Sequence, residues 1–406
     1  MAVIEDGFPQ LIALEGKATN LPSAIFYPSD MGEEILIGRA AVAAYLDQED
    51  GRLLRSLKSI LGSALIDAHT DLGPGRVMSF SDIISDYLAR LKSRAEKAIG
   101  HSLKRVLLGR PAFFVDDDPV RDQQAQDSLE SAARRAGFDE ISFEFEPVAA
   151  AYTFASDPEH ARPNLSEQRW ALVADLGGGT CDFSLLSLES GEQRILANHG
   201  VHVAGTDFDR RVALTQIMPL LGLGALNPNG RAVPNSIYRD LSTWHLVNGL
   251  YSRKSKAELH THRDLYGGKL FHTRLTKVLD ERLGHQLLAQ AEEAKIEASK
   301  SGQFDMLFDD LERGLKHSVS AAQVQLAITD ELSKIAEAAL ATLSQAGIAP
   351  SQVTELFFTG GSSGLEILRA NIASKLPQAR LIEGERFESV TLGLGLAATQ
   401  RWAEQT

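Results

Sequence analysis

The sequence predicts an α/β protein of two or more lobes, and three observations carry this prediction. The chain has 406 residues, more than one compact hydrophobic core accommodates. Runs that alternate apolar and polar residues, as strands do, recur along it, for example over residues 180–186. Helical patterns lie between these runs, and residues 79–99 carry a clear apolar stripe.

Composition and charge place the chain among globular proteins of a reducing compartment. Hydrophobic residues make up 44% and charged residues 23% of the sequence, the balance of a folded globular protein. The net charge of −13 argues against a nucleic-acid-binding surface, and no apolar run is long enough to span a membrane. The single cysteine, Cys181, excludes an internal disulfide and a cysteine-rich zinc site. Because the N-terminus lacks a signal-peptide pattern, we expect a cytoplasmic protein.

The stretch around which the other elements are arranged is A-L-V-A-D-L-G-G-G-T-C-D-F-S-L-L. Residues 171–175 and 180–186 have strand patterns, and Gly177, Gly178 and Gly179 lie between them. A hairpin with a glycine tip is therefore predicted. Three glycines weaken a turn entropically, so a turn that keeps them needs positive φ or close approach of a ligand to its main chain.

The glycine bend is suited to bind phosphate. Successive main-chain N–H groups in such a bend form a concave anion site. Asp175 and Asp182 are in position to hold a metal ion through water, and Thr180 offers a hydroxyl beside them. An ordinary hairpin with solvated aspartates is the alternative, and three glycines alone favour it. Motifs elsewhere in the chain favour the phosphate-binding interpretation over the ordinary hairpin.

The other elements follow from periodicity and turn residues. In the first third we expect a hairpin over residues 1–14 with its turn at Asp6 and Gly7, strands over 19–27, 34–38 and 105–114, a helix end over 52–62 and a helix over 79–99. In the middle we expect a strand entering a helix over 143–152, a polar loop over 156–168 and helices over 235–264. In the last part we expect helices over 281–299 and 321–346, a strand entering a glycine turn over 353–364 and a closing segment over 381–398.

Together these motifs resemble the nucleotide-binding domain of DnaK-type chaperones, the seventy-kilodalton heat-shock proteins of the actin-like ATPase superfamily. D-L-G-G-G-T-C-D is similar to the family's phosphate loop D-L-G-G-G-T-x-D, and F-E-F-E-P-V-A-A-A-Y is similar to its N-E-P-T-A-A-A-L-A-Y. The resemblance covers nearly the whole chain. It implies a two-lobed, ribonuclease H-like α/β fold in which each lobe has a mixed sheet flanked by helices.

The resemblance also implies how the chain divides. Lobe I is expected over residues 1–165, completed by 387–406, and lobe II over 166–386 with a helical subdomain at about 210–320. The family's first strand and its D-x-G-T-T-N-S loop have no counterpart here. Either the natural start lies upstream, which we favour, or half of the phosphate clamp is missing. No peptide-binding domain is expected within the 406 residues.

Phosphoryl chemistry is assigned by the resemblance to five residues. Lys58 corresponds to the lysine that faces the γ-phosphate, and Glu146 to the glutamate beside the metal and the attacking water. Asp175, Thr180 and Asp182 complete the set in the glycine hairpin. The two aspartates and Glu146 would hold Mg²⁺ through water. Without the resemblance, Lys58 is interpreted as a solvated helix lysine and Glu146 as a carboxylate at a helix N-terminus.

Nucleotide binding is assigned by the resemblance to three further segments. G-V-H-V-A-G-T-D-F-D is similar to H-L-G-G-E-D-F-D, A-E-E-A-K-I-E-A-S to the adenosine-gripping helix, and G-G-S-S-G to the adenosine loop G-G-S-T-R. Besides the glycine bend and Thr180, the predicted contacts are Gly205, Glu292, Lys295, Ser299, Gly360, Gly361, Ser362 and Ser363. A surface Glu–Lys pair and an ordinary glycine turn at a strand end are the alternatives.

Several positions depart from the family pattern. Pro111 matches the proline that switches between nucleotide states, but Gln126 stands where a relay arginine is expected. Gly364 replaces the arginine that stacks on adenine, Phe387 replaces an aspartate, and Ala204 replaces a glycine near phosphate. These changes predict weaker purine binding and an altered relay.

The sequence therefore predicts an ATP-binding, DnaK-like protein that hydrolyses ATP slowly and acts as a nucleotide-dependent switch, with ATP or ADP and Mg²⁺ between its lobes. A co-chaperone or another protein is an expected partner, and nucleic acid and membranes are not. The replaced residues leave open a non-hydrolysing nucleotide sensor or scaffold. A sugar kinase on the same fold is a third interpretation, which the G-G-S-S and E-P-V-A-A-A stretches fit less well.

Overall fold

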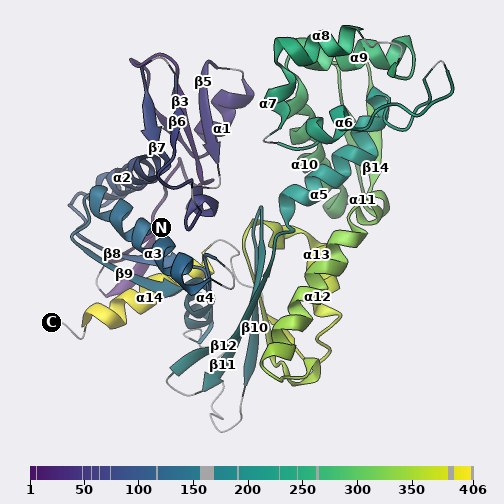
Figure 1. Ribbon diagram of the computed structural model, residues 1–406. Helices are drawn as coiled ribbons and strands as arrows, with labels where there is room; N and C mark the ends of the chain where they lie inside the picture. Colours follow the sequence, from purple (N-terminus) through teal and green to yellow (C-terminus); the bar gives the residue numbers. More distant parts are fainter. Residues whose placement is uncertain are drawn as a thin grey trace.

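A computed structural model gives the fold of most of the chain (Figure 1). It describes residues 1–5, 7–47, 49–55, 57–63, 65–73, 75–115, 118–155, 169–189, 192–227, 229–244, 246–261, 265–382 and 388–403. The polar loop expected over 156–168, the turn residue Asp6 and the departure at Phe387 lie outside these residues. The predicted mixture of strands and helices is confirmed.

A mixed five-stranded sheet lies at the centre of the molecule, in the order β12-β11-β10-β15-β16. Its strands are β10 (Trp170–Leu176), β11 (Cys181–Glu189), β12 (Glu192–Val201), β15 (Glu355–Thr359) and β16 (Arg380–Ile382). The predicted glycine-tipped hairpin is confirmed, because β10 pairs antiparallel with β11. On its other side β10 pairs parallel with β15.

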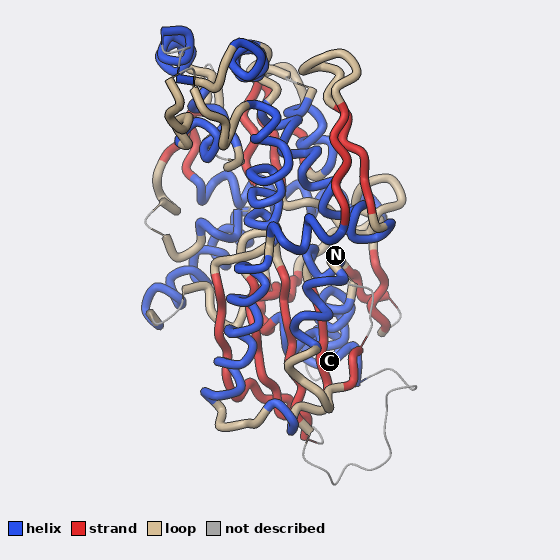
Figure 2. Tube along the Cα trace, turned by 90° about the vertical axis from the view of Figure 1, so that its right-hand side faces the viewer, coloured by secondary structure: helices blue, strands red, loops and turns tan. Residues whose placement is uncertain are grey.

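Helices cover both faces of this sheet. One face packs on α12 (Thr329–Gln345) and α13 (Glu366–Ala373), and the other on α4 (Glu146–Ala155). Figure 2, viewed from the side of α12 and α13, shows helices in front of the strands.

Both faces of β10 are consequently buried. Leu172 and Ala174 belong to the largest hydrophobic core, whereas Ala171 and Val173 pack with residues of α4. Because side chains alternate along a strand, Asp175 lies on the same face as Val173. The strand therefore ends with a carboxylate on the face that α4 covers.

Residues 1–145 form small sheets with their own helices. The sheets are β1 (Ala2–Glu5) with β2 (Phe8–Leu11), β3 (Ala24–Pro28) between β4 (Leu36–Ile37) and β5 (Gly51–Arg55), β6 (His69–Asp71) with β7 (Val77–Ser79), and β8 (Arg105–Arg110) with β9 (Glu140–Phe145). The helices are α1 (Arg39–Leu46), α2 (Phe80–Ile99) and α3 (Pro119–Arg135). The hairpin predicted over 1–14 is confirmed, because β1 pairs antiparallel with β2.

The last described helix, α14 (Ser389–Ala403), returns to this N-terminal part (Figure 1). It packs on β1, β2, β8 and α4. Just before it, Glu388 accepts a hydrogen bond of 2.5 Å from the Thr19 hydroxyl, across 369 residues of sequence. The boundaries proposed above for the two lobes stay a prediction.

Residues 205–327 form a group of helices and one hairpin that shares the largest core with the central sheet. These elements are α5 (Gly205–Val212), α6 (Ser236–Leu241), α7 (Val247–Leu250), α8 (Arg253–Thr261), α9 (Lys269–Asp280), α10 (Gly284–Ser301), β13 (Gln303–Leu307), β14 (Lys316–Ser320) and α11 (Ala321–Ala327). They meet the N-terminal part where the Tyr45 hydroxyl lies 3.1 Å from Nε2 of His285 and 3.1 Å from Oδ1 of Asn248. Within the part of the chain that the structure describes, none of the helices combines the length and hydropathy needed to cross a bilayer.

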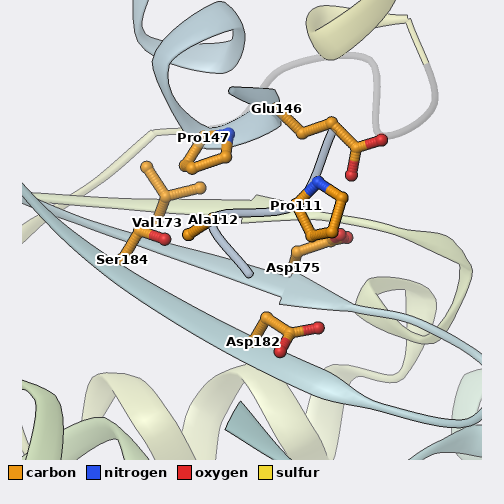
Figure 3. Close-up of a pocket in the computed structure, with 8 residues that line it drawn as sticks. All are labelled: Pro111, Ala112, Glu146, Pro147, Val173, Asp175, Asp182 and Ser184. Atoms are coloured by element: carbon orange, nitrogen blue, oxygen red, sulfur yellow. The ribbon is translucent and has the colours of Figure 1, made fainter. Parts of the chain in front are cut away.

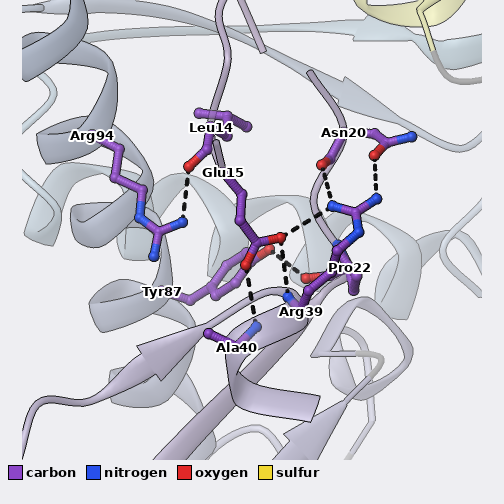
Figure 4. A network of polar contacts seen from close by, with 8 residues as sticks. All are labelled: Leu14, Glu15, Asn20, Pro22, Arg39, Ala40, Tyr87 and Arg94. Atoms are coloured by element: carbon purple, nitrogen blue, oxygen red, sulfur yellow. Dashed lines mark hydrogen bonds and ion pairs between the residues drawn. The ribbon is translucent and has the colours of Figure 1, made fainter. Parts of the chain in front are cut away.

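A polar network joins the segment after the first hairpin to α1 (Figure 4). Helix α1 has no side-chain cap of its own, and the carboxylate of Glu15 accepts hydrogen bonds from the amides of Arg39 and Ala40, each 3.2 Å long. Burial would raise the pKa of Glu15, but these hydrogen bonds outweigh it and hold the pKa below its ordinary value. The Arg39 guanidinium also donates to the Asn20 carbonyl at 2.9 Å. A distant glutamate thus satisfies the first amides of α1.

Two local predictions are wrong. Residues 51–55 are strand β5, and a short 3₁₀ helix, Leu57–Ile60, follows. The described residues between 52 and 62 therefore hold no end of an α-helix. Leu54 is buried in one hydrophobic cluster and Leu53 packs, partly buried, against another on the opposite face of the small sheet. Two adjacent apolar leucines imitate a helical stripe. The single helix predicted over 321–346 is interrupted at the buried Ile328, where the Thr329 hydroxyl bonds the carbonyl of Gln325 at 2.9 Å.

Helices α4 and α14 touch at Gly393, where an added Cβ would lie 1.7 Å from the carbonyl oxygen of Ala149. We expect Gly393→Ala to destabilise the protein by about 3 kcal/mol, because the backbones must separate. Urea denaturation measures the change. Gly249→Ala is the control, since an added Cβ in α7 meets nothing within 4 Å. Equal stability of the two alanine variants would contradict this packing.

Candidate functional site

The candidate site lies where the ends of β10 and β11 face the start of α4 (Figure 3). Asp175 and Asp182 are directly opposite each other in the β10–β11 ladder. A cavity in front of them is lined by Pro111, Ala112, Glu146, Pro147, Val173, Asp175, Asp182 and Ser184. The three glycines of the bend are not among these residues, although they adjoin Asp175 and Asp182 in sequence.

Lys58 and Glu146, 88 residues apart in sequence, meet at this site. The Lys58 ammonium donates to both carboxylate oxygens of Glu146, at 2.8 and 2.7 Å. Burial alone would lower the pKa of Lys58, but Glu146 and then Asp175 outweigh it, and the pKa lies above its ordinary value. Lys58 is therefore a cation held by the carboxylates around it.

Asp175 lies in the most polar part of the site. Burial, followed by the charge of Glu146, raises the pKa of Asp175 to about 6. Lys58 acts in the opposite direction, as does the hydroxyl of Thr359, which donates to Oδ1 of Asp175 at 2.9 Å. Sequence reasoning missed Thr359. The available signal was a hydroxyl residue at the end of a strand, directly after three apolar residues.

The donor set suits a hydrated divalent cation. The carboxylates of Glu146, Asp175 and Asp182 face one ammonium, that of Lys58, so carboxylate oxygens are in excess, and such oxygens are the ligands that Mg²⁺ takes. Thr180 donates to Oδ2 of Asp182 at 3.0 Å. Among the described residues no group of three or more His, Cys, Asp and Glu is arranged to ligate a metal directly. Binding of a cation through water at this site stays a prediction.

The carbonyls of the glycine bend are tied to the protein. The Ser362 hydroxyl donates to the carbonyl of Gly177 at 2.6 Å, and the amide and hydroxyl of Thr206 both donate to that of Gly178 at 2.8 Å. Across a trans peptide the C=O and the following N–H point in opposite directions. The amides of Gly178 and Gly179 therefore point away from Ser362 and from the start of α5.

The fold itself does not demand glycine at positions 178 and 179, whereas a Cβ at Gly177 would lie 3.0 Å from the carbonyl oxygen of Thr180. None of Gly177, Gly178 and Gly179 is among the residues with positive φ, so the first explanation for the triple glycine does not apply. A Cβ added at Gly178 or Gly179 meets nothing within 4 Å. Of the two reasons offered by the sequence, close approach of a ligand is the one that remains.

The residues predicted to bind adenosine are partly occupied by other contacts. On α10, Lys295 is buried and pairs with Oδ1 of Asp209 at 2.6 Å, while Glu292 is exposed. Burial raises the pKa of Asp209 to about 6, and Lys295 acts in the opposite direction. The Ser299 hydroxyl donates to the carbonyl of Lys295 at 2.6 Å. The nucleoside role of these side chains stays a prediction.

The glycine turn after β15 packs against the end of β10 and the glycine bend. Gly360 has φ +81° and abuts the end of β10, and the Ser363 hydroxyl, fully buried, donates to the carbonyl of Gly360 at 2.6 Å. A Cβ added to Gly205 would lie 2.4 Å from Oγ of Ser362. Gly361 begins the 3₁₀ helix Gly361–Gly364. The structure thus brings Gly205 and Ser362 to the glycine bend.

Arg110, which sequence reasoning passed over, holds the wall of the cavity. Its guanidinium is buried, donates to Oδ2 of Asp122 at 2.6 Å and to the carbonyl of Pro111 at 3.2 Å. It also donates to Oε1 of Gln126 at 2.5 Å, the residue in place of the expected relay arginine. The signal was a charged residue at the end of a strand, after an apolar run and directly before a proline.

Comparisons with known proteins agree with this arrangement. A model of the Hsp70 protein family matches residues 1–217. The chain is 25% identical to a chaperone protein DnaK of Mycoplasmoides gallisepticum over 364 residues, covering 89% of this chain and 51% of that protein. It is 29% identical to a chaperone protein DnaK of Metamycoplasma hominis over 213 residues, 52% of this chain and 32% of the relative.

A third relative is a chaperone protein HscA homolog of Cupriavidus pinatubonensis, 30% identical over 244 residues, 56% of this chain and 36% of that protein. The chain spans about half or less of the length of these three relatives. The family match covers more than half of the chain and agrees with its mixed sheet covered by helices. The chain belongs to the Hsp70 family and has the actin-like ATPase fold that its sequence predicts.

Proposed function

We propose that the site binds ATP or ADP with Mg²⁺ and that the protein is a nucleotide-dependent switch that hydrolyses ATP slowly. The observation that carries the proposal is the glycine bend. Two of its carbonyls are bound from one side, so two successive amides point to the other, and no contact within the protein requires glycine at positions 178 and 179. Such paired amides are suited to phosphate oxygens.

The charged side chains of the site are suited both to the cation and to a phosphate oxygen. Asp175, Asp182 and Glu146 would hold Mg²⁺ through water, and the ion would neutralise charge on the phosphates. Lys58 would leave Glu146 to face a phosphate oxygen, where an ammonium stabilises developing negative charge. Thr180 and Gly205 would lie beside the phosphates. The curated relatives are chaperones by name, and this supports a partner protein as the reader of the switch.

Gly178→Ala tests the proposal. We expect an unchanged urea midpoint, because the added methyl meets nothing in the protein, and an ATP affinity at least about 10-fold lower, because the methyl meets phosphate. Calorimetric titration with ATP and Mg²⁺ measures the affinity. Gly249→Ala, equally unhindered but in α7, should bind like the wild type. Wild-type affinity in Gly178→Ala, or no ATP binding by the wild type, would refute the proposal.

A non-hydrolysing nucleotide sensor is the second candidate, and the contact between Lys58 and Glu146 favours it. The two groups assigned to the chemical step neutralise each other through both carboxylate oxygens. ATP binding without phosphate release in a single-turnover assay would select the sensor, and measurable Mg²⁺-dependent release would select the ATPase.

A further inference from the structure

Residues 359–362, between β15 and its 3₁₀ turn, contact the phosphate side of the site at three places. The first is Thr359, which is buried and opposite Asp175 in the parallel ladder of β10 and β15. Its hydroxyl donates to Oδ1 of Asp175 at 2.9 Å. One carboxylate oxygen of Asp175 is therefore fixed from the neighbouring strand.

The second contact is made by the backbone of Gly360. At this residue a Cβ would lie 2.7 Å from Oδ1 of Asp175 and 2.5 Å from the carbonyl oxygen of Leu176. Gly360 also has φ +81°, in the region that favours glycine. The chain after β15 is thus pressed against the end of β10, immediately before the glycine bend.

The third contact is the hydroxyl of Ser362. It donates to the carbonyl of Gly177 at 2.6 Å and occupies the space that a side chain at position 205 would fill. A hydroxyl has one proton to donate, and here it is used within the protein. The neighbouring Ser363 hydroxyl is fully buried and donates to Gly360. Neither serine hydroxyl has a proton left for a nucleoside.

We propose that Thr359 and Ser362 are positioning residues of the phosphate and cation site. Thr359 fixes the rotamer of Asp175, and Ser362 fixes the glycine bend against α5, so that both are in place before a ligand arrives. This differs from the nucleoside contact that the sequence predicts for Ser362. The inference rests on the proposed function, since it concerns the same ligand.

Thr359→Val tests the positioning role of Thr359. Valine has nearly the same shape and lacks the donor, so we expect ATP affinity in the presence of Mg²⁺ to fall about 10-fold. Thr359→Ser restores the donor and should bind within about 2-fold of the wild type. The control is Thr342→Val in α12, which removes a buried hydroxyl that donates at 2.9 Å to the carbonyl of Ala338 and is not among the residues that line the cavity. It should leave ATP affinity unchanged.

Ser362→Ala tests the positioning role of Ser362 with two ligands, ATP with Mg²⁺ and adenosine. A positioning role predicts about 10-fold weaker ATP binding and unchanged adenosine binding, because adenosine has no phosphate. Equal losses for both probes would restore the nucleoside role and overturn the inference for Ser362. Wild-type ATP affinity in Thr359→Val would overturn it for Thr359. If the wild type itself fails to bind ATP, the proposed function falls and this inference with it, a result distinct from the other two.

Discussion

Asp175→Asn is expected to stabilise the protein at pH 7 and to remove Mg²⁺-dependent ATP binding. Burial and the charge of Glu146 raise the pKa of Asp175 from 3.8 to about 6. The folded state therefore favours neutral Asp175 more than the unfolded state does, and the charge of the Asp175 carboxylate lowers stability at pH 7. A neutral amide avoids this cost, and we expect a gain on the order of 1–3 kcal/mol. The Asn oxygen still accepts the hydrogen bond from Thr359. ATP affinity with Mg²⁺ should fall at least about 100-fold, because an anionic ligand of the cation is lost.

The raised pKa of Asp175 also fixes how the free energy of unfolding changes with pH. Between about pH 4 and pH 6 the folded state binds more protons at Asp175 than the unfolded state does, so wild-type stability falls as pH rises through this window. The Asn variant should lack the part of this decline that Asp175 contributes and keep the part from Asp209, whose pKa is also raised to about 6. Urea denaturation at pH 4, 5, 6 and 7 measures the free energy of unfolding, and calorimetry measures ATP binding. A variant less stable than the wild type at pH 7, or one that binds ATP normally, would contradict our account of Asp175.

Asp122→Ala is expected to cost about 3–5 kcal/mol of stability, because it leaves the buried guanidinium of Arg110 without its carboxylate. The amide of Phe114 loses its acceptor as well, since Oδ1 of Asp122 accepts its hydrogen bond at 2.5 Å. The loss should also loosen the cavity wall, where Arg110 donates to the carbonyls of Pro111 and Ala112.

The control for Asp122→Ala is Asp139→Ala, which breaks the ion pair between Lys104 and Asp139. That pair is 3.5 Å long, and its side chains are 74% and 70% exposed. Solvent screens such pairs, so the change should stay below about 1 kcal/mol. Both free energies come from urea denaturation. A cost for Asp122→Ala as small as the control's would show that the Arg110 network contributes little to stability.

Much of the fold could be predicted because local signals were strong. The hairpin around the glycine bend has strands of alternating pattern, and its observed register places Asp175 opposite Asp182. Helix α2 begins after Ser79, whose hydroxyl accepts the amide of Asp82 at 3.1 Å. The prediction was wrong where tertiary contacts override periodicity, as at Leu53 and Leu54 on the two faces of one small sheet.

The candidate site could be predicted only in part. Family resemblance, and no local pattern, indicated that Lys58 and Glu146 belong together. The contacts of Thr359 with Asp175 and of Arg110 with Asp122 were out of reach, because each depends on which strand or helix lies beside which. The predicted nucleotide contacts remain predictions, and the structure adds that Lys295 and Ser363 already have partners within the protein.

The return of α14 to the first hairpin bears on how the chain folds during synthesis. The strands β1 and β2 are made long before α14, the helix that packs on them. The hydrogen bond between Thr19 and Glu388, just before α14, spans 369 residues of sequence. Contacts of such long sequence separation form slowly, and the hairpin's apolar side has to wait for them. A nascent chain therefore exposes the side of the β1–β2 hairpin that faces α14 until residues 389–403 have been made.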